Sequence, residues 1–245
     1  MPLFNFALRP VADIQAWRGP KGPTLSWFAL SDGWFWLALA GQEILKVEGP
    51  MTPGDLPYVD YQVVRLWEDL IAMLPAVLSE VPTDVAERLE DRAAWDVVLE
   101  RTKEADDAER AALGMGWWWE RQLDNAYLAA APKVHLWRRN EVIYARWSTP
   151  KSEHSWCPVE GEATIAVDDF LAELRAFDAT FIAAMSERVT AIKSEGGIEG
   201  VNIDLAHLEH EQLDRATWLE RALAAPTLPC NWNDARWILQ QLGSH

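Results

Sequence analysis

The sequence predicts an α+β fold with two antiparallel β-meanders, each followed by a long helix, a helical insert between these units and a helical C-terminal region. Three observations lead to this prediction. Short apolar runs separated by turn residues occur near the start and again from residue 132. Each set of runs precedes a long segment in which apolar side chains recur every three or four positions. The segment between the units is rich in alanine and acidic residues.

We therefore expect three regions that form one compact, two-lobed body. Residues 1–82 make the first meander-plus-helix unit, 83–131 the acidic helical insert, and 132–245 the second unit with its C-terminal helices. The order of elements repeats after about 110 residues. Internal duplication and independent origin of the two units both remain open.

The first unit begins with FNFAL, whose apolar residues alternate as in a half-buried strand. TLSWFAL, WFWLALA and EILKVEG then predict further strands, because turn residues separate them. The Asp32-Gly33 pair is a strong hairpin signal, since glycine accepts the positive φ of tight turns. A helix over 58–81 follows, and we expect Pro75 to kink it.

In the second unit, KVHLWRR and EVIYARW predict a hairpin that turns at Asn140. SWCPV and EATIAV are candidates to extend it. A helix over 168–192 follows, with Asp168 placed to cap its start. After the glycine-containing loop SEGGIEG, two more helices are expected at 204–224 and 232–242.

The insert has Thr83 as a candidate N-cap and an apolar face that starts with Val85 and Leu89. The rest of its surface is crowded with carboxylates, at Glu87, Glu90, Asp91, Asp96, Glu100, Glu104, Asp106, Asp107 and Glu109. Such a run is typical of a solvated helix face.

Composition limits the classes of partner. The chain has 245 residues, with 38 acidic and 22 basic side chains and a net charge of −16, so its field repels nucleic acid and attracts basic surfaces. We expect neither a signal peptide nor a membrane helix, because the most apolar run, WFWLALA, is much too short. Two cysteines, Cys157 and Cys230, give no disulfide framework and fit a cytoplasmic protein.

The opening FNFALRP, the segment LSWFALSDGWFW, the long stretch WWWERQLDNAYLAAAPKVHLWRRNEVIYARW and the helix FLAELRAFDATFIAAMSERV together resemble a family of bacterial proteins of unknown function. Its members open with an F-x-F-x-L-x-P strand and a W-F-x-L-T-D-G turn. Here Ser31 replaces the usual threonine and AWRGP replaces a frequent Pro-Trp-Gly. The resemblance covers most of the chain and implies no catalytic residues. The polar positions that match it are Asp32, Gly33, Glu43, Arg121, Asp124 and Tyr127.

Three consecutive tryptophans, Trp117 to Trp119, raise a packing question. Side chains on a helix turn by roughly 100° per residue, so the three indoles fan over roughly 200° and cannot all enter one core. At least one must face a second layer, which is a seam between the two units, a pocket or a partner.

No catalytic motif stands out, and we predict neither a cofactor nor a metal. HLEHE places His207, His210 and Glu211 on one helix face, where an ordinary solvated surface is the alternative to metal binding. His154 and Cys157 could pair as imidazole and thiol, with packing as the alternative.

We interpret the chain as an acidic binding protein for a basic protein, with no nucleic acid or membrane partner. The specific form that we expect is an immunity or antitoxin-type inhibitor of a basic bacterial toxin. The expected contact residues combine tryptophans with nearby charges: Asp32, Trp34, Trp117, Trp118, Trp119, Glu120, Arg121 and Asp124. Glu120 and Asp124, four residues apart beside Arg121, also fit an acid/base site, with surface ion pairing as the alternative. The competing functions are an enzyme or small-molecule binder with an aromatic cleft between the two units, and a subunit of a larger assembly.

Overall fold

The computed structural model describes residues 1–49, 51–103, 108–124, 127–128, 131–149, 156–225 and 230–243. The strands are β1 (Phe4–Leu8), β2 (Trp17–Gly19), β3 (Gly22–Thr24), β4 (Asp32–Leu39), β5 (Gln42–Ile44), β6 (Lys46–Val47), β7 (Val59–Gln62), β8 (Lys133–Arg139), β9 (Val142–Ser148), β10 (Trp156–Cys157) and β11 (Glu160–Ala166). The helices are α1 (Trp27–Leu30), α2 (Val63–Leu78), α3 (Thr83–Glu90), α4 (Arg92–Lys103), α5 (Ala108–Trp119), α6 (Val167–Ser194), α7 (Leu205–Arg215), α8 (Trp218–Ala224) and α9 (Trp232–Gly243), and a 3₁₀ turn, η1, spans Val11–Asp13.

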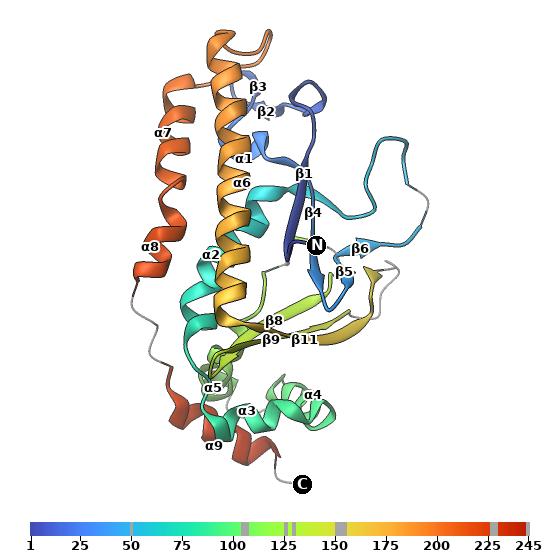
Figure 1. Cartoon of the computed structure of the whole chain (residues 1–245), viewed down its shortest axis with the longest axis vertical. Coiled ribbons are helices and arrows are strands. Elements are labelled where there is room, and N and C mark those ends of the chain that lie inside the picture. The colour runs from blue at the N-terminus through green and yellow to red at the C-terminus, as the bar shows by residue number, and fades with distance from the viewer. Residues whose placement is uncertain are drawn as a thin grey trace.

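The predicted α+β fold is confirmed. α6 runs along the long axis of the molecule, with α7 and α8 beside it (Figure 1). The sheet β1-β4-β5, to which β7 adds by pairing with β4, lies next to α6. The second sheet, β11-β9-β8, crosses below it, and α3, α4, α5 and α9 occupy the lower end.

One core joins the two predicted units. Phe4 of β1 packs against Phe177 of α6 in a tilted arrangement, with 5.7 Å between ring centroids, and Phe6 packs edge-on against Phe181 at 5.6 Å. The indole N–H of Trp27 donates to Gln212 at 2.7 Å. Because the same cluster of buried side chains includes α2 and residues of β8 and β9, the meanders share their interior.

The second sheet is covered on both faces. Successive side chains of a strand point in opposite directions, so β8 contributes residues to a core on each side. Val134 and Leu136 of β8 belong to the shared core. Trp137 of the same strand belongs to a second core beneath the sheet, built with α3, α4, α5 and α9. The insert therefore forms a helical layer over the outer face of this sheet.

α9 closes the second core from the far end of the chain. Ala235, Ile238 and Leu239 are buried in it. A Cβ added to Gly114 of α5 would lie 2.3 Å from the Ile238 side chain and 3.0 Å from a backbone oxygen of α9, so this glycine allows the two helices their close approach.

The TLSWFAL run is not a strand. Its central residues form the short helix α1, because the Ser26 side chain accepts a hydrogen bond from the amide of Ala29 at 3.3 Å and caps the turn. The Asp32-Gly33 pair is therefore not a hairpin turn but the start of β4. The turn lies instead at Ala40-Gly41, where both φ angles are positive, between β4 and β5.

Other boundaries also differ from the prediction. The helix expected over 58–81 begins at Val63, since the preceding residues pair with β4 as β7. SWCPV supplies β10, which pairs with β6 of the first unit, whereas β11 extends the predicted hairpin. The helix expected over 204–224 is divided into α7 and α8.

The two predicted N-caps are wrong by one or two residues. Asp168 lies in the first turn of α6, whose cap position is Ala166. Thr83 is the first residue of α3, whose cap position is Pro82. Neither cap position makes a side-chain hydrogen bond. Asp168 still places a negative charge where the helix dipole favours it.

Two Gly→Ala variants compare a crowded glycine in β4, Gly33, with an uncrowded one in α5, Gly116. A Cβ on Gly33 would lie 2.2 Å from the Ala7 carbonyl oxygen, so Gly33→Ala is expected to lower the free energy of unfolding by about 1–3 kcal/mol. A Cβ on Gly116, in the helix α5, meets nothing within 4 Å, so Gly116→Ala should raise that free energy by about 0.5–1 kcal/mol. Urea denaturation of both variants measures the difference. Equal effects of the two substitutions would contradict this account.

Candidate functional site

The predicted contact residues fall into separate places. Asp32 and Trp34 lie on β4, where Arg9 bonds Asp32 at 3.0 Å and its guanidinium carbon lies 4.3 Å from the Trp34 ring centroid. Arg9 also bonds Asp60 at 2.7 Å. Trp34 is buried and belongs to the first sheet. The structure therefore does not bring this pair together with the tryptophan run on α5.

The tryptophan run is divided between the interior and the surface. Trp117 and Trp118 are buried in the second core, where their ring centroids lie 5.8 Å and 5.0 Å from that of Trp95. Trp118 also stacks on His135 with a 4.0 Å separation. Trp119 is 45% exposed. Two indoles thus fill the layer beneath the second sheet and the third faces outward.

Arg121 is fully buried. Its guanidinium donates to the Trp117 carbonyl at 2.6 Å and to the Ser79 carbonyl at 3.1 Å, which ties the end of α5 to the end of α2. Burial lowers the pKa of Arg121. The structure therefore buries three of the predicted contact residues: Arg121, Trp117 and Trp118. A protein partner cannot contact them without a change in the packing around them. Glu120 and Asp124 are exposed.

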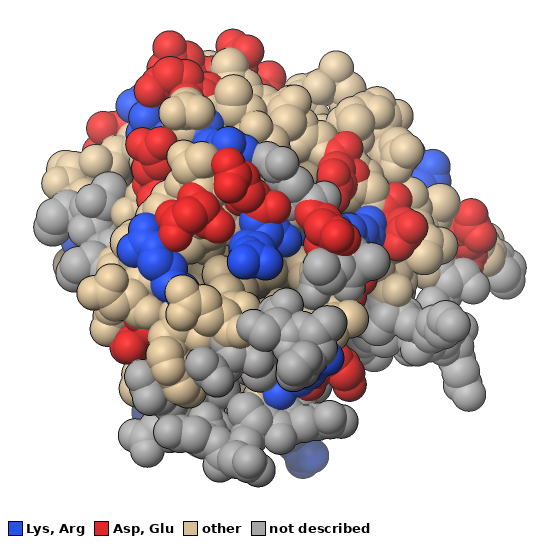
Figure 2. All heavy atoms as spheres, turned by 90° about the horizontal axis from the view of Figure 1, so that it is seen from below, with Lys and Arg blue, Asp and Glu red and all other residues tan. Residues whose placement is uncertain are grey.

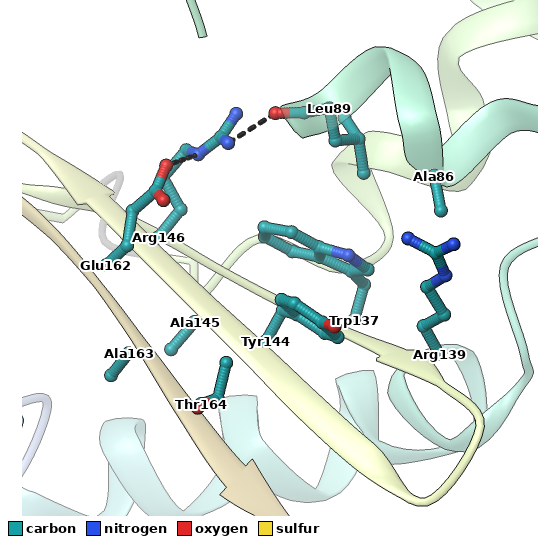
Figure 3. Close-up of a pocket in the computed structure, with 10 residues that line it drawn as sticks. All are labelled: Ala86, Leu89, Trp137, Arg139, Tyr144, Ala145, Arg146, Glu162, Ala163 and Thr164. Atoms are coloured by element: carbon teal, nitrogen blue, oxygen red, sulfur yellow. Dashed lines mark hydrogen bonds and ion pairs between the residues drawn. The ribbon is translucent and has the colours of Figure 1, made fainter. Parts of the chain in front are cut away.

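A cavity of about 340 Å³ lies between α3 and the outer face of the second sheet (Figure 3). Trp137 and Tyr144 lie side by side at its centre, with ring planes 15° apart. Arg146 spans one edge, where it donates to Glu162 at 2.7 Å and to the Leu89 carbonyl. The cavity is lined by Ala86, Leu89, Trp137, Arg139, Tyr144, Ala145, Arg146, Glu162, Ala163 and Thr164.

A second cavity, of about 250 Å³, also has Arg146 in its wall and extends toward α4 and α5. Its lining residues are Arg92, Trp95, Asp96, Leu99, Glu100, Trp118, Trp119, Gln122, Lys133, His135, Arg146 and Ser148. We call this space the α4–α5 cavity. Its buried residues, Trp95, Trp118, His135 and Arg146, mark the floor, and the exposed ones, among them Asp96, Glu100 and Trp119, mark the mouth.

His135 and Arg146 are the unusual groups of this floor. They are cross-strand neighbours of β8 and β9 and are each 7% exposed. Nε2 of His135 and Nη1 of Arg146 have no hydrogen-bond partner among the described residues. Burial lowers the pKa of His135 to about 3, with smaller contributions from Lys133 and Arg146, so the imidazole is neutral at pH 7. Both residues thus line the α4–α5 cavity, while these two nitrogens are themselves buried.

Sequence reasoning did not select this pair, although the hairpin contains the information. A turn at Asn140 sets the register of β8 against β9, and that register places His135 opposite Arg146. The sequence did not indicate that a helical layer covers this face of the sheet, and that layer is what buries His135 and Arg146.

A separate acidic group lies on α2. Burial raises the pKa of Asp69 to about 7, and the negative charge of Asp124 adds to this rise. Tyr127, whose ring stacks on Tyr61 at 4.7 Å, lies beneath the Arg65 guanidinium at 5.2 Å. Asp124, predicted as a contact residue, therefore also contributes to the electrostatics of α2.

Glu211 of the metal candidate HLEHE takes part in an ion-pair network with Arg215. Glu211 accepts from Arg215 at 3.0 Å, and Arg215 also donates to Glu68 of α2 at 2.6 Å. Across the described ranges, no three His, Cys, Asp or Glu side chains lie close enough together to hold a metal ion. Cys157 has a free thiol, and His154 lies outside the described residues.

Comparisons with known proteins give one match. The model of a family described as "Family of unknown function (DUF5984)" matches residues 3–237. No curated protein and no solved structure matches the chain. In the part of the chain that the structure describes, no helix has the length and apolar character needed to span a bilayer.

The neutral His135 predicts a pH-dependent stability. Below its ordinary pKa of about 6.5 the unfolded chain binds a proton that the folded protein excludes, so stability falls as the pH drops from 6.5 toward 3. The stability difference between wild type and His135→Gln should shift by about 2 kcal/mol between pH 7 and pH 5, against the wild type. Urea denaturation at the two pH values measures it. A difference between wild type and variant that is the same at both pH values would contradict this account.

Asp69 predicts the opposite trend. Its folded-state pKa of about 7 means that the folded protein keeps a proton that the unfolded chain releases above about pH 4. The wild type therefore loses stability as the pH rises from about 4 to 7, and Asp69→Asn removes this loss. Thermal denaturation should show the variant gaining on the wild type across that range and holding its advantage above it. A constant difference at all pH values would exclude this assignment.

Proposed function

We propose that this chain, which belongs to the family of unknown function DUF5984, is an acidic binding protein for a basic protein partner. The observation that carries the proposal is the mouth of the α4–α5 cavity, where the exposed indole of Trp119 and the carboxylates of Asp96 and Glu100 border one depression. A lysine or arginine side chain fits such a place, because an indole face and carboxylates both attract a cation.

The proposed contact surface is smaller than the one expected from the sequence. It keeps Trp119 with the adjacent exposed Glu120 and adds Asp96 and Glu100 of the cavity mouth. Asp124 is exposed but acts on Asp69 of α2 and does not line this cavity. We leave out Trp34, Trp117, Trp118 and Arg121 because they are buried. Asp32 is also left out, since it is occupied by Arg9. An exposed aromatic with charged neighbours remains a good interface anchor.

Long-range electrostatics supports the same kind of partner. A net charge of −16 speeds encounter with a basic protein and slows encounter with nucleic acid. Figure 2 shows the lower end of the molecule, where basic side chains lie among the acidic ones. This mixture favours a partner with a patterned surface over a uniformly positive one. We propose, as the specific form of this function, an immunity or antitoxin-type inhibitor of a basic bacterial toxin.

The experiment compares two charge reversals of equal size. Asp96→Lys/Glu100→Lys changes the proposed surface, and Glu195→Lys/Glu199→Lys changes exposed residues in the loop after α6, at the other end of the molecule. Wild type, both variants and Trp119→Ala are used as baits in native lysate, and the captured proteins are identified. We expect a basic protein that wild type and the loop variant retain and that the other two lose.

The affinity of the purified pair should then fall at least about tenfold when NaCl is raised from about 0.05 to 0.5 M, since exposed charges are screened. Trp119→Ala should weaken binding by about 2 kcal/mol, as for an interface anchor, with little change in the stability of the free protein. Capture of a partner equally by both charge-reversed variants, or binding indifferent to salt, would contradict the proposal.

The second candidate function is a small-molecule binder. The sequence placed its aromatic cleft between the two units, whereas the cavities described above lie between the second sheet and the insert. The α4–α5 cavity favours this candidate, because it is lined by two buried polar residues, His135 and Arg146, each with an unpartnered nitrogen among the described residues.

A further inference from the structure

We infer that the basic partner adds an extended segment to the open edge of β11, as an antiparallel strand that continues the order β11-β9-β8, with basic side chains against Glu160 and Glu162. The identity of the occupant rests on the proposed function. The docking edge itself stands on the hydrogen-bond pattern of β11.

β11 is an edge strand in the part of the chain that the structure describes. Its seven residues pair with β9, and no other described strand pairs with them. Two backbone hydrogen bonds at its ends show which residues face β9. The amide of Thr149 donates to the Val159 carbonyl at 2.6 Å, and the amide of Val167 donates to the Glu141 carbonyl at 3.0 Å.

Hydrogen-bonded and non-hydrogen-bonded pairs alternate along an antiparallel ladder. The register between these two bonds is continuous, so every second residue from Val159 to Val167 directs its N–H and C=O toward β9. Glu160, Glu162 and Thr164 therefore direct theirs away from β9, and all three residues are exposed. Such a row of outward donors and acceptors is a template for the addition of a strand.

Charge favours a basic segment over a second copy of this chain. The side chains of Glu160 and Glu162 are 64% and 54% exposed, although Arg92 and Arg146 each bond one of their oxygens. A carboxylate accepts from more than one donor, so both can also bond lysines on an added strand. Two copies paired along β11 would instead bring together chains that each carry −16.

The edge also continues the proposed contact surface. Arg92, which bonds Glu160 at 3.0 Å, lines the α4–α5 cavity together with Asp96 and Glu100. The start of β11 therefore adjoins the mouth at which the partner is proposed to bind. One partner segment can thus follow the edge while the rest of the partner contacts the mouth.

The cavity between α3 and the second sheet selects a side chain at the other end of the segment. Thr164 lines this cavity beside its cross-strand neighbour Tyr144 (Figure 3). Since adjacent strands lie about 4.8 Å apart, a residue opposite Thr164 starts roughly 10 Å from β9, on the same face of the sheet. An aromatic side chain is long enough to cross the small threonine and contact the Tyr144 ring. The antiparallel direction then gives the segment an aromatic residue followed by two basic residues, at alternate positions from its N-terminus.

Synthetic peptides test the inference on the purified full-length chain. The probe has the seven-residue length of β11, with tryptophan, lysine and lysine at its second, fourth and sixth positions and threonine elsewhere. N-methyl groups on these three residues remove the amides directed at β11, whereas N-methyl groups on the three threonines that follow them remove amides directed away. Calorimetry should show binding at least about tenfold weaker for the first methylated peptide and within about twofold of the parent for the second.

Variants locate the edge. Thr164→Pro removes an outward donor and no bond to β9, and proline is tolerated on the open side of an edge strand. Glu160→Gln/Glu162→Gln removes the charges of the edge, and Glu195→Gln/Glu199→Gln is the matched control in the loop after α6. The first two variants should bind the parent peptide at least about tenfold more weakly, and the control should bind it as the wild type does. Thermal denaturation checks that each variant is folded.

Three results would overturn the inference. They are equal affinities of the two methylated peptides, a folded Thr164→Pro variant that binds the parent peptide as the wild type does, and self-association of the wild type that Thr164→Pro abolishes, because the edge would then belong to a second copy. The capture from lysate separates this inference from the proposed function. A basic protein captured equally by Thr164→Pro and the wild type would overturn strand addition alone. The expected peptide results without any captured basic protein would contradict the proposed function alone.

Discussion

The second sheet is the element on which the rest of the structure depends, because both of its faces are buried. Val134 and Leu136 pack upward into the core shared with α2 and α6, while His135 and Trp137 face the helical layer below. A strand alternates its side chains between the two faces, so every second residue must suit a different interior. The insert between the two meanders covers the lower face of this sheet. Trp117 and Trp118 of α5 fill the space between the insert and the sheet.

This arrangement answers the packing question raised by three consecutive tryptophans. Trp117 and Trp118 differ by about 100° around the helix, and both can enter one core because that core lies on more than one side of α5. The sheet lies on one side, with His135 stacked on Trp118, while Trp232, the first residue of α9, lies 5.4 Å from Trp117 between ring centroids. Trp119 lies another step around the helix, at the border of the α4–α5 cavity, and is 45% exposed.

Local patterns predicted the long elements well and the short ones poorly. The hairpin at Asn140 and the helix α6 were evident because turn chemistry and a long apolar period agree over many residues. TLSWFAL read as a strand because its composition suits a strand, yet a single serine cap decides a segment of four residues. Arg121 looked like a surface charge, since sequence does not reveal two backbone carbonyls brought from α2 and α5 to meet its guanidinium. The candidate cavity depends on packing between distant segments, and so only the register of its floor was available in advance.

The position of α9 also bears on how the molecule is made. Ala235, Ile238 and Leu239 complete a core that also contains residues of α3 and α4, which are synthesised more than a hundred positions earlier. Those helices leave the ribosome well before the strands and the last helix that cover their apolar sides. During translation, Trp95 and the apolar residues around it are therefore exposed until the strands and α9 have been synthesised. A chaperone that binds exposed apolar surfaces would bind this helical layer for the longest time.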